Sequence, residues 1–193
     1  MATKPLLSDA PEVVAPSLLG MRLVSELGGV RVSALITEVE AYGGVGLDAA
    51  SHSHRGRTPR NGIMFGASGL LYVYRSYGMH WCLNVVTGPE GDASAVLLRA
   101  GEIVEGAEAA RSRRVKCRRD RDLARGPGRL AQALGITGEQ NGIDLLSRIG
   151  PVRLRPRGSD VIPVHVAGPR IGISKEVDRP WRFWWEGHPT VSR

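Results

Sequence analysis

Short aliphatic and β-branched runs, separated by glycine-rich turns, dominate the first half of the chain. Two of these runs, Met21–Leu27 and Val30–Glu40, flank Gly28 and Gly29, a pairing typical of a tight hairpin. A polar loop follows. Three further runs then predict the strands of an antiparallel meander, at Leu70–Tyr77, His80–Thr87 and Ser94–Ala100.

Helices are predicted on both sides of this meander. The first, Glu12–Leu19, ends before Gly20, a residue suited to the left-handed conformation that closes a helix. Later in the chain, Glu102–Arg125 and Arg129–Leu134 are predicted as helices separated by a Gly-Pro-Gly break. Two short strands are expected in the tail, at Pro169–Ser174 and Trp181–Trp185. Because strands come in runs and never alternate as β-α-β units, the predicted class is α+β on an antiparallel sheet.

The composition fits one globular domain. With 193 residues, of which 42% are hydrophobic, the chain can bury one sizeable core but falls short of two. We therefore expect a single domain over residues 1–193, with a flexible segment at 1–11. There is no run of about 20 apolar residues and no signal-peptide pattern, so a cytoplasmic, nucleoid-associated protein is expected. Cys82 and Cys117 lack metal or disulfide spacing and are expected to be reduced thiols.

Positive charge is concentrated in one segment. The formal net charge of +7 favours a polyanionic partner. Residues 111–125 carry eight basic side chains against Asp120 and Asp122, a local charge of +6. The simpler interpretation is a solvated helix face, and the alternative is contact with DNA phosphates regardless of base sequence.

A carboxylate and an aromatic ring stand at the end of the second predicted strand. Glu40 and Tyr42 are two residues apart and share one face while the strand continues. Taken alone, they fit a solvated glutamate beside a rim tyrosine. The following loop, residues 43–69, is rich in polar and cationic groups, as functional loops often are, namely Asp48, His52, His54, Arg55, Arg57, Arg60 and Asn61.

Tyrosines mark the third predicted strand. Tyr72 and Tyr74 share a face, which fits either ordinary core packing or a platform on which bases stack. Tyr77 comes directly before the turn at Gly78, so its ring is expected to project from a hairpin tip. A ring in such a place can act as a wedge between base pairs.

Together, the basic surface, the wedge, the stacking pocket and the carboxylate indicate base flipping. An enzyme that cuts the bond between sugar and base has to extrude the nucleotide from the duplex. Electron-rich rings favour positively charged, N-alkylated purines through cation–π attraction. Since a cationic purine leaves without a general acid, Glu40 alone could activate the water and stabilise the developing sugar cation.

The chain resembles the alkyladenine (3-methyladenine) DNA glycosylase family, in its bacterial form, over roughly Val13–Ser192. The order and spacing of several segments make this resemblance specific. They are EAY at 40–42, ASH at 50–52, RTPRN at 57–61, MFG at 64–66, LYVY at 71–74, YGMHWCLN at 77–84, AVLLRA at 95–100, GPG at 126–128, NGIDL at 141–145, GPRIGI at 168–173 and PWRF at 180–183.

The resemblance implies roles for individual residues. Glu40 would be the general base, and Arg99 would help it to hold the attacking water. Tyr42 would stack on one face of the flipped base, with Tyr74 and His52 on the other.

Further residues would contact the base or the DNA. Asn84, in the pocket floor, would exclude the exocyclic amine of normal guanine, and Tyr77 would fill the vacated space in the DNA through the minor groove. We also expect DNA contacts from Met79, Arg57 and Arg60.

The family's properties define the remaining expectations. They imply a compact domain with a curved, partly open, barrel-like antiparallel sheet, flanking helices and a protruding β-hairpin. They also imply a monomer without metal or organic cofactor, acting on double-stranded DNA with alkylated bases. We expect a monofunctional glycosylase of base excision repair that releases 3-methyladenine and 7-methylguanine, with hypoxanthine and ethenoadenine as further candidates. The segment Gly43–Leu47 is one residue longer than the family pattern.

Two other functions fit subsets of these residues. A non-catalytic module that binds DNA or RNA would use the basic and aromatic surface without requiring Glu40. A metal-dependent nuclease would use Asp48, His52 and His54, although no third ligand stands at a recognisable spacing from the two histidines.

Overall fold

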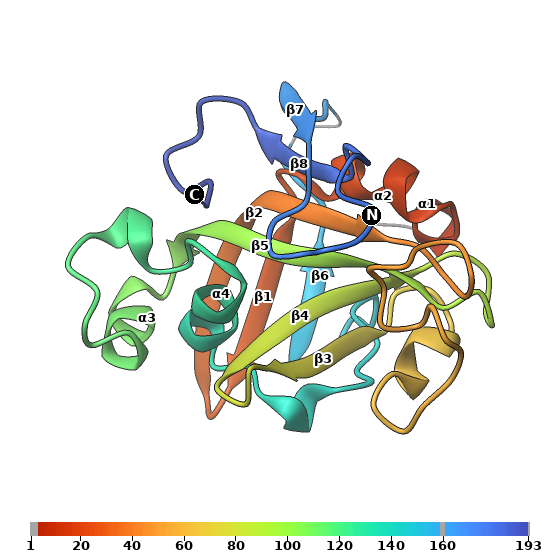
Figure 1. The fold of residues 1–193 in the computed structure, drawn as a ribbon. Coiled ribbons are helices and arrows are strands. Elements are labelled where there is room, and N and C mark those ends of the chain that lie inside the picture. The colour runs from red at the N-terminus through yellow and green to blue at the C-terminus, as the bar shows by residue number, and fades with distance from the viewer. Residues whose placement is uncertain (1–3, 159–160, 193) are drawn as a thin grey trace.

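One curved antiparallel sheet forms the body of the computed structural model, which describes residues 4–158 and 161–192 (Figure 1). Its strands follow the order β3-β4-β5-β2-β1-β6, and β8 pairs with both β2 and β7. The strands are β1 (Arg22–Leu27), β2 (Val30–Tyr42), β3 (Leu71–Ser76), β4 (His80–Thr87), β5 (Ser94–Glu105), β6 (Val152–Arg155), β7 (His165–Gly168) and β8 (Arg182–Trp185).

Short helices pack around this sheet. Each of the two longest, α2 and α4, has proline in its first turn, where the missing N–H would have no partner within the helix. Their buried faces include Val14 and Leu18 on α2, and Leu130 and Leu134 on α4, all part of the main core. The helices are α1 (Lys4–Leu7), α2 (Pro11–Leu18), α3 (Ala107–Arg113) and α4 (Pro127–Leu134), with 3-10 turns η1 (Gly62–Phe65), η2 (Asp120–Asp122) and η3 (Gly138–Gln140).

The long strand β2 changes partner along its length. It pairs with β1 up to Leu35, and with β8 from Glu38 to Glu40, while β5 pairs along its other edge. The β2–β5 register shifts around Thr37, and such bulges bend a strand. Gly101 allows the close approach there, since a Cβ would lie 2.8 Å from the Leu35 carbonyl oxygen. The bend places Glu38 and Glu40 between β5 and β8.

The predicted fold class is confirmed. The structure is an α+β domain with a curved antiparallel sheet, and the predicted hairpin and meander are present as β1–β2 and β3–β4–β5. None of the helices in the described ranges has the length and apolar character needed to span a membrane. Cys82 and Cys117 are both free thiols.

Two predicted elements are wrong. The segment Glu102–Arg125 is not one helix, because β5 continues to Glu105 along β2, and only Ala107–Arg113 is helical. Pairing with a neighbouring strand here outweighs the local helix propensity. Residues 169–174 form an irregular segment instead of a strand, and β6 and β7 were not predicted.

The N-terminal segment has structure of its own. Within the expected flexible stretch 1–11, Lys4–Leu7 forms α1, and the Leu7 side chain is fully buried in the core. Residues 1–3 lie outside the described residues.

Candidate active site

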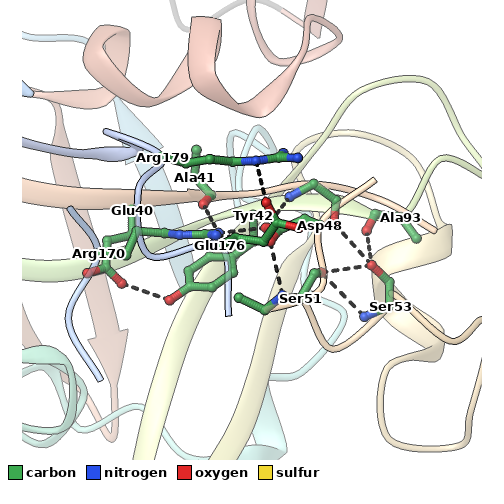
Figure 2. A network of polar contacts seen from close by, with 12 residues as sticks. Glu40, Ala41, Tyr42, Asp48, Ser51, Ser53, Ala93, Arg170, Glu176 and Arg179 are labelled. Carbon is green, nitrogen blue, oxygen red and sulfur yellow. Dashed lines mark hydrogen bonds and ion pairs between the residues drawn. The ribbon is translucent and has the colours of Figure 1, made fainter. Parts of the chain in front are cut away.

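Glu40 is a fully buried carboxylate that accepts two hydrogen bonds and forms one ion pair. The Tyr42 hydroxyl donates to Oε2 at 2.8 Å (Figure 2). The Ile171 amide donates to Oε1 at 2.7 Å. Arg99 Nη1 lies 3.1 Å from Oε1. The interpretation of a solvated glutamate is therefore wrong, and the shared face expected for Glu40 and Tyr42 is present as a direct hydrogen bond.

The surroundings of Arg99 and Tyr42 raise the pKa of both side chains and keep both protonated. Burial opposes the charge on Arg99, but the carboxylates of Glu40 and Glu38 outweigh it and raise the Arg99 pKa. Burial, and next the charge of Glu40, raise the pKa of Tyr42. The Tyr42 hydroxyl therefore stays protonated and donates a hydrogen bond to the Glu40 carboxylate.

A cavity of about 400 Å³ opens beside this carboxylate. This volume is typical of small-molecule sites. Tyr42 and Arg99, which both contact Glu40, form part of its wall, and Glu40 itself lies directly behind them. The other predicted pocket residues that line the cavity are His52, Tyr74 and Asn84, and Tyr77 and Arg60 line it as well.

Aromatic side chains pack edge-on in the cavity wall. The His52 ring centroid lies 4.5 Å from that of Tyr74, and its Nδ1 is 3.0 Å from the Tyr72 hydroxyl. Although solvent reaches part of the side chain, burial lowers the His52 pKa, and the Arg60 guanidinium lowers it further. His52 is therefore neutral at pH 7. Asn84 is buried, and its Nδ2 donates to the Tyr72 carbonyl at 3.1 Å.

Arg170 packs against the ring of Tyr42 without lining the cavity, and it was not predicted from the sequence. Its guanidinium carbon lies 4.7 Å from the centre of the Tyr42 ring and 5.4 Å from that of Trp181. It forms two bonds to Asp48, Nη1 to Oδ2 at 2.6 Å and Nη2 to Oδ1 at 2.9 Å, and both side chains are completely buried. The signal in the sequence was the GPRIGI segment at 168–173, most of which lies in the predicted strand Pro169–Ser174.

Asp48 ties the loop after β2 to this arginine. Burial would raise the Asp48 pKa, but the Arg170 guanidinium and the backbone amides of Gly43 and Ala50 outweigh it and hold the pKa below its usual value. In the longer segment Gly43–Leu47, a Cβ on Gly44 would overlap the Asp92 carbonyl oxygen, so this position requires glycine. Figure 2 shows that the same network extends through Ser51 and Ser53 to Ala93.

These contacts contradict the nuclease alternative. The Asp48 carboxylate is occupied by Arg170, and His52 by Tyr72. Within the described part of the chain, no three His, Cys, Asp or Glu side chains are grouped so that they could hold a metal ion.

Two of the residues expected to contact DNA, Tyr77 and Arg60, line the cavity, whereas Met79 and Arg57 do not. Tyr77 is 87% exposed at the tip of the β3–β4 hairpin and has a φ of 49°, which is uncommon for a residue other than glycine. Met79, in the same turn, is 69% exposed. Arg60 and Arg57 are exposed, with guanidinium carbons 5.4 Å and 5.8 Å from the ring centres of Tyr74 and Phe65.

The basic segment 111–125 is not a single solvated helix face. Arg113 and Arg114 donate to backbone carbonyls of Ala133 and Leu123, so these side chains support the local fold. Others in the segment remain exposed, among them Lys116, Arg118 and Arg121.

Comparisons with known proteins identify the family of this chain. The family model described as methylpurine-DNA glycosylase matches residues 6–189. A Nocardia farcinica protein is 52% identical over 188 residues, covering 94% of this chain and 86% of its own length. A Mycobacterium tuberculosis protein is 52% identical, covering 94% and 88%, and a Rhodococcus jostii protein 51%, covering 94% and 80%.

All three relatives carry the name "Putative 3-methyladenine DNA glycosylase". The range matched by the family model includes every residue of the site described above. The chain therefore belongs to the methylpurine-DNA glycosylase family and is a DNA glycosylase, a hydrolase of the N-glycosidic bond.

Proposed function

We propose that this protein is a monofunctional glycosylase of base excision repair that flips an alkylated purine out of duplex DNA and hydrolyses its N-glycosidic bond with a water activated by Glu40. The observation that carries the proposal is a fully buried carboxylate, bonded to Tyr42 and Arg99, directly behind an aromatic cavity of about 400 Å³. The enzyme would act as a monomer in the cytoplasm, at the nucleoid.

The cavity suits a flat, positively charged base. Tyr42 would stack on one face of the flipped purine, with Tyr74 and His52 on the other. Rings of this kind attract cations. Neutral His52 adds no positive charge that would repel such a base. Asn84 in the wall would exclude the exocyclic amine of guanine.

Water activation would require a rearrangement at Glu40. Its Oε2 accepts a hydrogen bond from the Tyr42 hydroxyl, and its Oε1 accepts one from the Ile171 amide and forms an ion pair with Arg99. A water that enters along Arg99 could replace the Tyr42 bond at Oε2, where Glu40 would take its proton. The same negative charge would stabilise the cationic sugar in the transition state.

Cationic lesions should be the principal substrates. 3-Methyladenine and 7-methylguanine leave without protonation, whereas hypoxanthine and ethenoadenine leave more slowly without a general acid. Among the described residues that line the cavity there is no lysine that could attack the sugar and nick the strand. The expected product is therefore an abasic site in an uncut strand.

The first test is to incubate the protein with methylated duplex DNA in the presence of EDTA, and to assay free purines and alkali-labile sites. Release of 3-methyladenine without direct strand cutting supports the proposal. Glu40→Gln, which keeps the shape but removes the charge, should abolish release and leave binding of damaged duplex largely unchanged. If binding is strong but no base is released by the wild-type protein, the non-catalytic binding module becomes the better description.

A further inference from the structure

A second buried carboxylate, Glu38, lies two residues before Glu40 on β2, and the proposed reaction does not use it. Its side chain is fully buried, and its Oε1 accepts Arg99 Nε at 2.9 Å and Arg182 Nε at 2.7 Å. Burying a charge is costly unless it is paired and hydrogen-bonded, and this one is held by two guanidinium groups. The charge of Glu38 is therefore compensated inside the fold.

The C-terminal segment completes the cage around Glu38. The Ser192 amide donates to Oε2 at 2.6 Å, and the Ser192 hydroxyl lies 2.9 Å from Oε1. The Ser192 Oγ also accepts Arg99 Nη2 at 3.3 Å. Arg182, on β8, donates in addition to the Ser192 carbonyl at 3.1 Å.

Arg99 bridges the two carboxylates of β2. Its Nε faces Glu38, and its Nη1 faces Glu40. A guanidinium is a rigid, planar fork, so fixing its Nε edge also fixes the direction of Nη1. Without Glu38, Arg99 could turn its fork onto Glu40 in a two-bond pair, and would then occupy the oxygen that has to receive the water's proton.

We propose that Glu38 is a positioning residue for base excision, and that with Ser192 as its brace it holds Arg99 so that a single guanidinium nitrogen contacts Glu40. This inference rests on the proposed function, since it assigns Glu38 a role through Arg99 in the reaction of Glu40. Glu38 acts on the rate of the chemical step and has no contact with the DNA.

The test compares single-turnover excision of 3-methyladenine with binding of a duplex that holds a stable tetrahydrofuran abasic site. Glu38→Gln removes the charge at nearly constant shape, and the excision rate should fall by about tenfold or more, as misplacement of a catalytic group does. The dissociation constant should stay within about twofold. The matched control, Glu105→Gln, removes an exposed carboxylate paired with Arg31 far along β5, and should excise at the wild-type rate.

A double-mutant cycle with Arg99→Ala tests whether Glu38 acts through Arg99. If it does, Glu38→Gln should slow the Arg99→Ala enzyme by less than about twofold, because residues that act as a unit are not additive. An undiminished rate in Glu38→Gln, a full tenfold loss in the Arg99→Ala background, or a loss confined to DNA binding would each overturn the inference.

Two further variants keep the outcome interpretable. If Glu38→Gln does not fold, Ser192→Ala takes its place, because it removes one hydroxyl that contacts both Glu38 and Arg99. Its excision rate should fall by about threefold at unchanged DNA affinity, and a wild-type rate would overturn the inference. Glu40→Gln distinguishes failure of the proposed function from failure of the positioning role of Glu38. If it excises normally, the proposed function fails, and if it is inactive while Glu38→Gln is normal, only the positioning role fails.

Discussion

The pair between Asp48 and Arg170 should dominate the stability of the catalytic end of the sheet. Both side chains are completely buried and joined by two bonds, at 2.6 Å and 2.9 Å. Asp48→Asn keeps the shape but leaves the Arg170 charge buried without its counter-charge. Breaking a buried pair from one side costs about 3–5 kcal/mol. Since about 1 kcal/mol shifts the Tm of a protein of this size by about 2–4 °C, Tm should fall by roughly 10 °C at pH 7.

Calorimetry or urea unfolding of three proteins would measure this effect. The double variant Asp48→Asn/Arg170→Met removes both charges and should recover most of the lost Tm, because no orphan charge remains. The Asp48 pKa is lowered in the folded state, so its stabilisation is complete above the unfolded value of about 3.9 and is lost as the pH falls through the lower folded value. The gap between wild type and Asp48→Asn should therefore close in acid. A Tm loss below about 2 °C at pH 7, or a double variant no better than Asp48→Asn, would refute the reasoning.

Three further predictions concern the aromatic wall, the hairpin tip and the basic segment. Because the pKa of His52 is lowered in the folded state, its contribution to stability is complete above the unfolded value of about 6.5 and is lost as the pH falls through the lower folded value. His52→Gln should accordingly flatten Tm against pH between 5 and 7, and an unchanged slope would contradict the pKa shift. Tyr77→Ala should leave Tm unchanged, because the ring is 87% exposed, and should weaken binding of lesion-bearing duplex by about tenfold in a gel-shift titration. Equal binding by both proteins would exclude Tyr77 as the wedge. Replacing the exposed Lys116, Arg118 and Arg121 by glutamate should reduce the slope of log Kd against log salt by about 3, and an unaltered slope would mean that the segment does not contact phosphates.

Local patterns explain why much of the sheet could be predicted. The β1–β2 hairpin and the meander β3–β4–β5 follow from short hydrophobic runs between glycine turns, and both signals act within a few residues. Alternation along a strand likewise placed Glu40 and Tyr42 on one face, and the Gly78 turn placed Tyr77 at an exposed tip. The same local reasoning failed at Glu102–Glu105, where composition favoured a helix and pairing with β2 made a strand.

The amino-acid sequence by itself therefore determined the α+β class, the meander and the two β2 residues around which the site forms. The tertiary structure decided the rest of the site. Arg170 and Ile171 reach Ala41 and Glu40 from about 130 positions away, and Ser192 reaches Glu38 across 154. No sequence periodicity predicts such contacts. They arise only because β2 pairs with β1 in its first half and with β8 in its second half, which brings segments distant in the sequence next to Glu38 and Glu40. The same pairing buries Glu38 and Glu40 completely and places both carboxylates against Arg99.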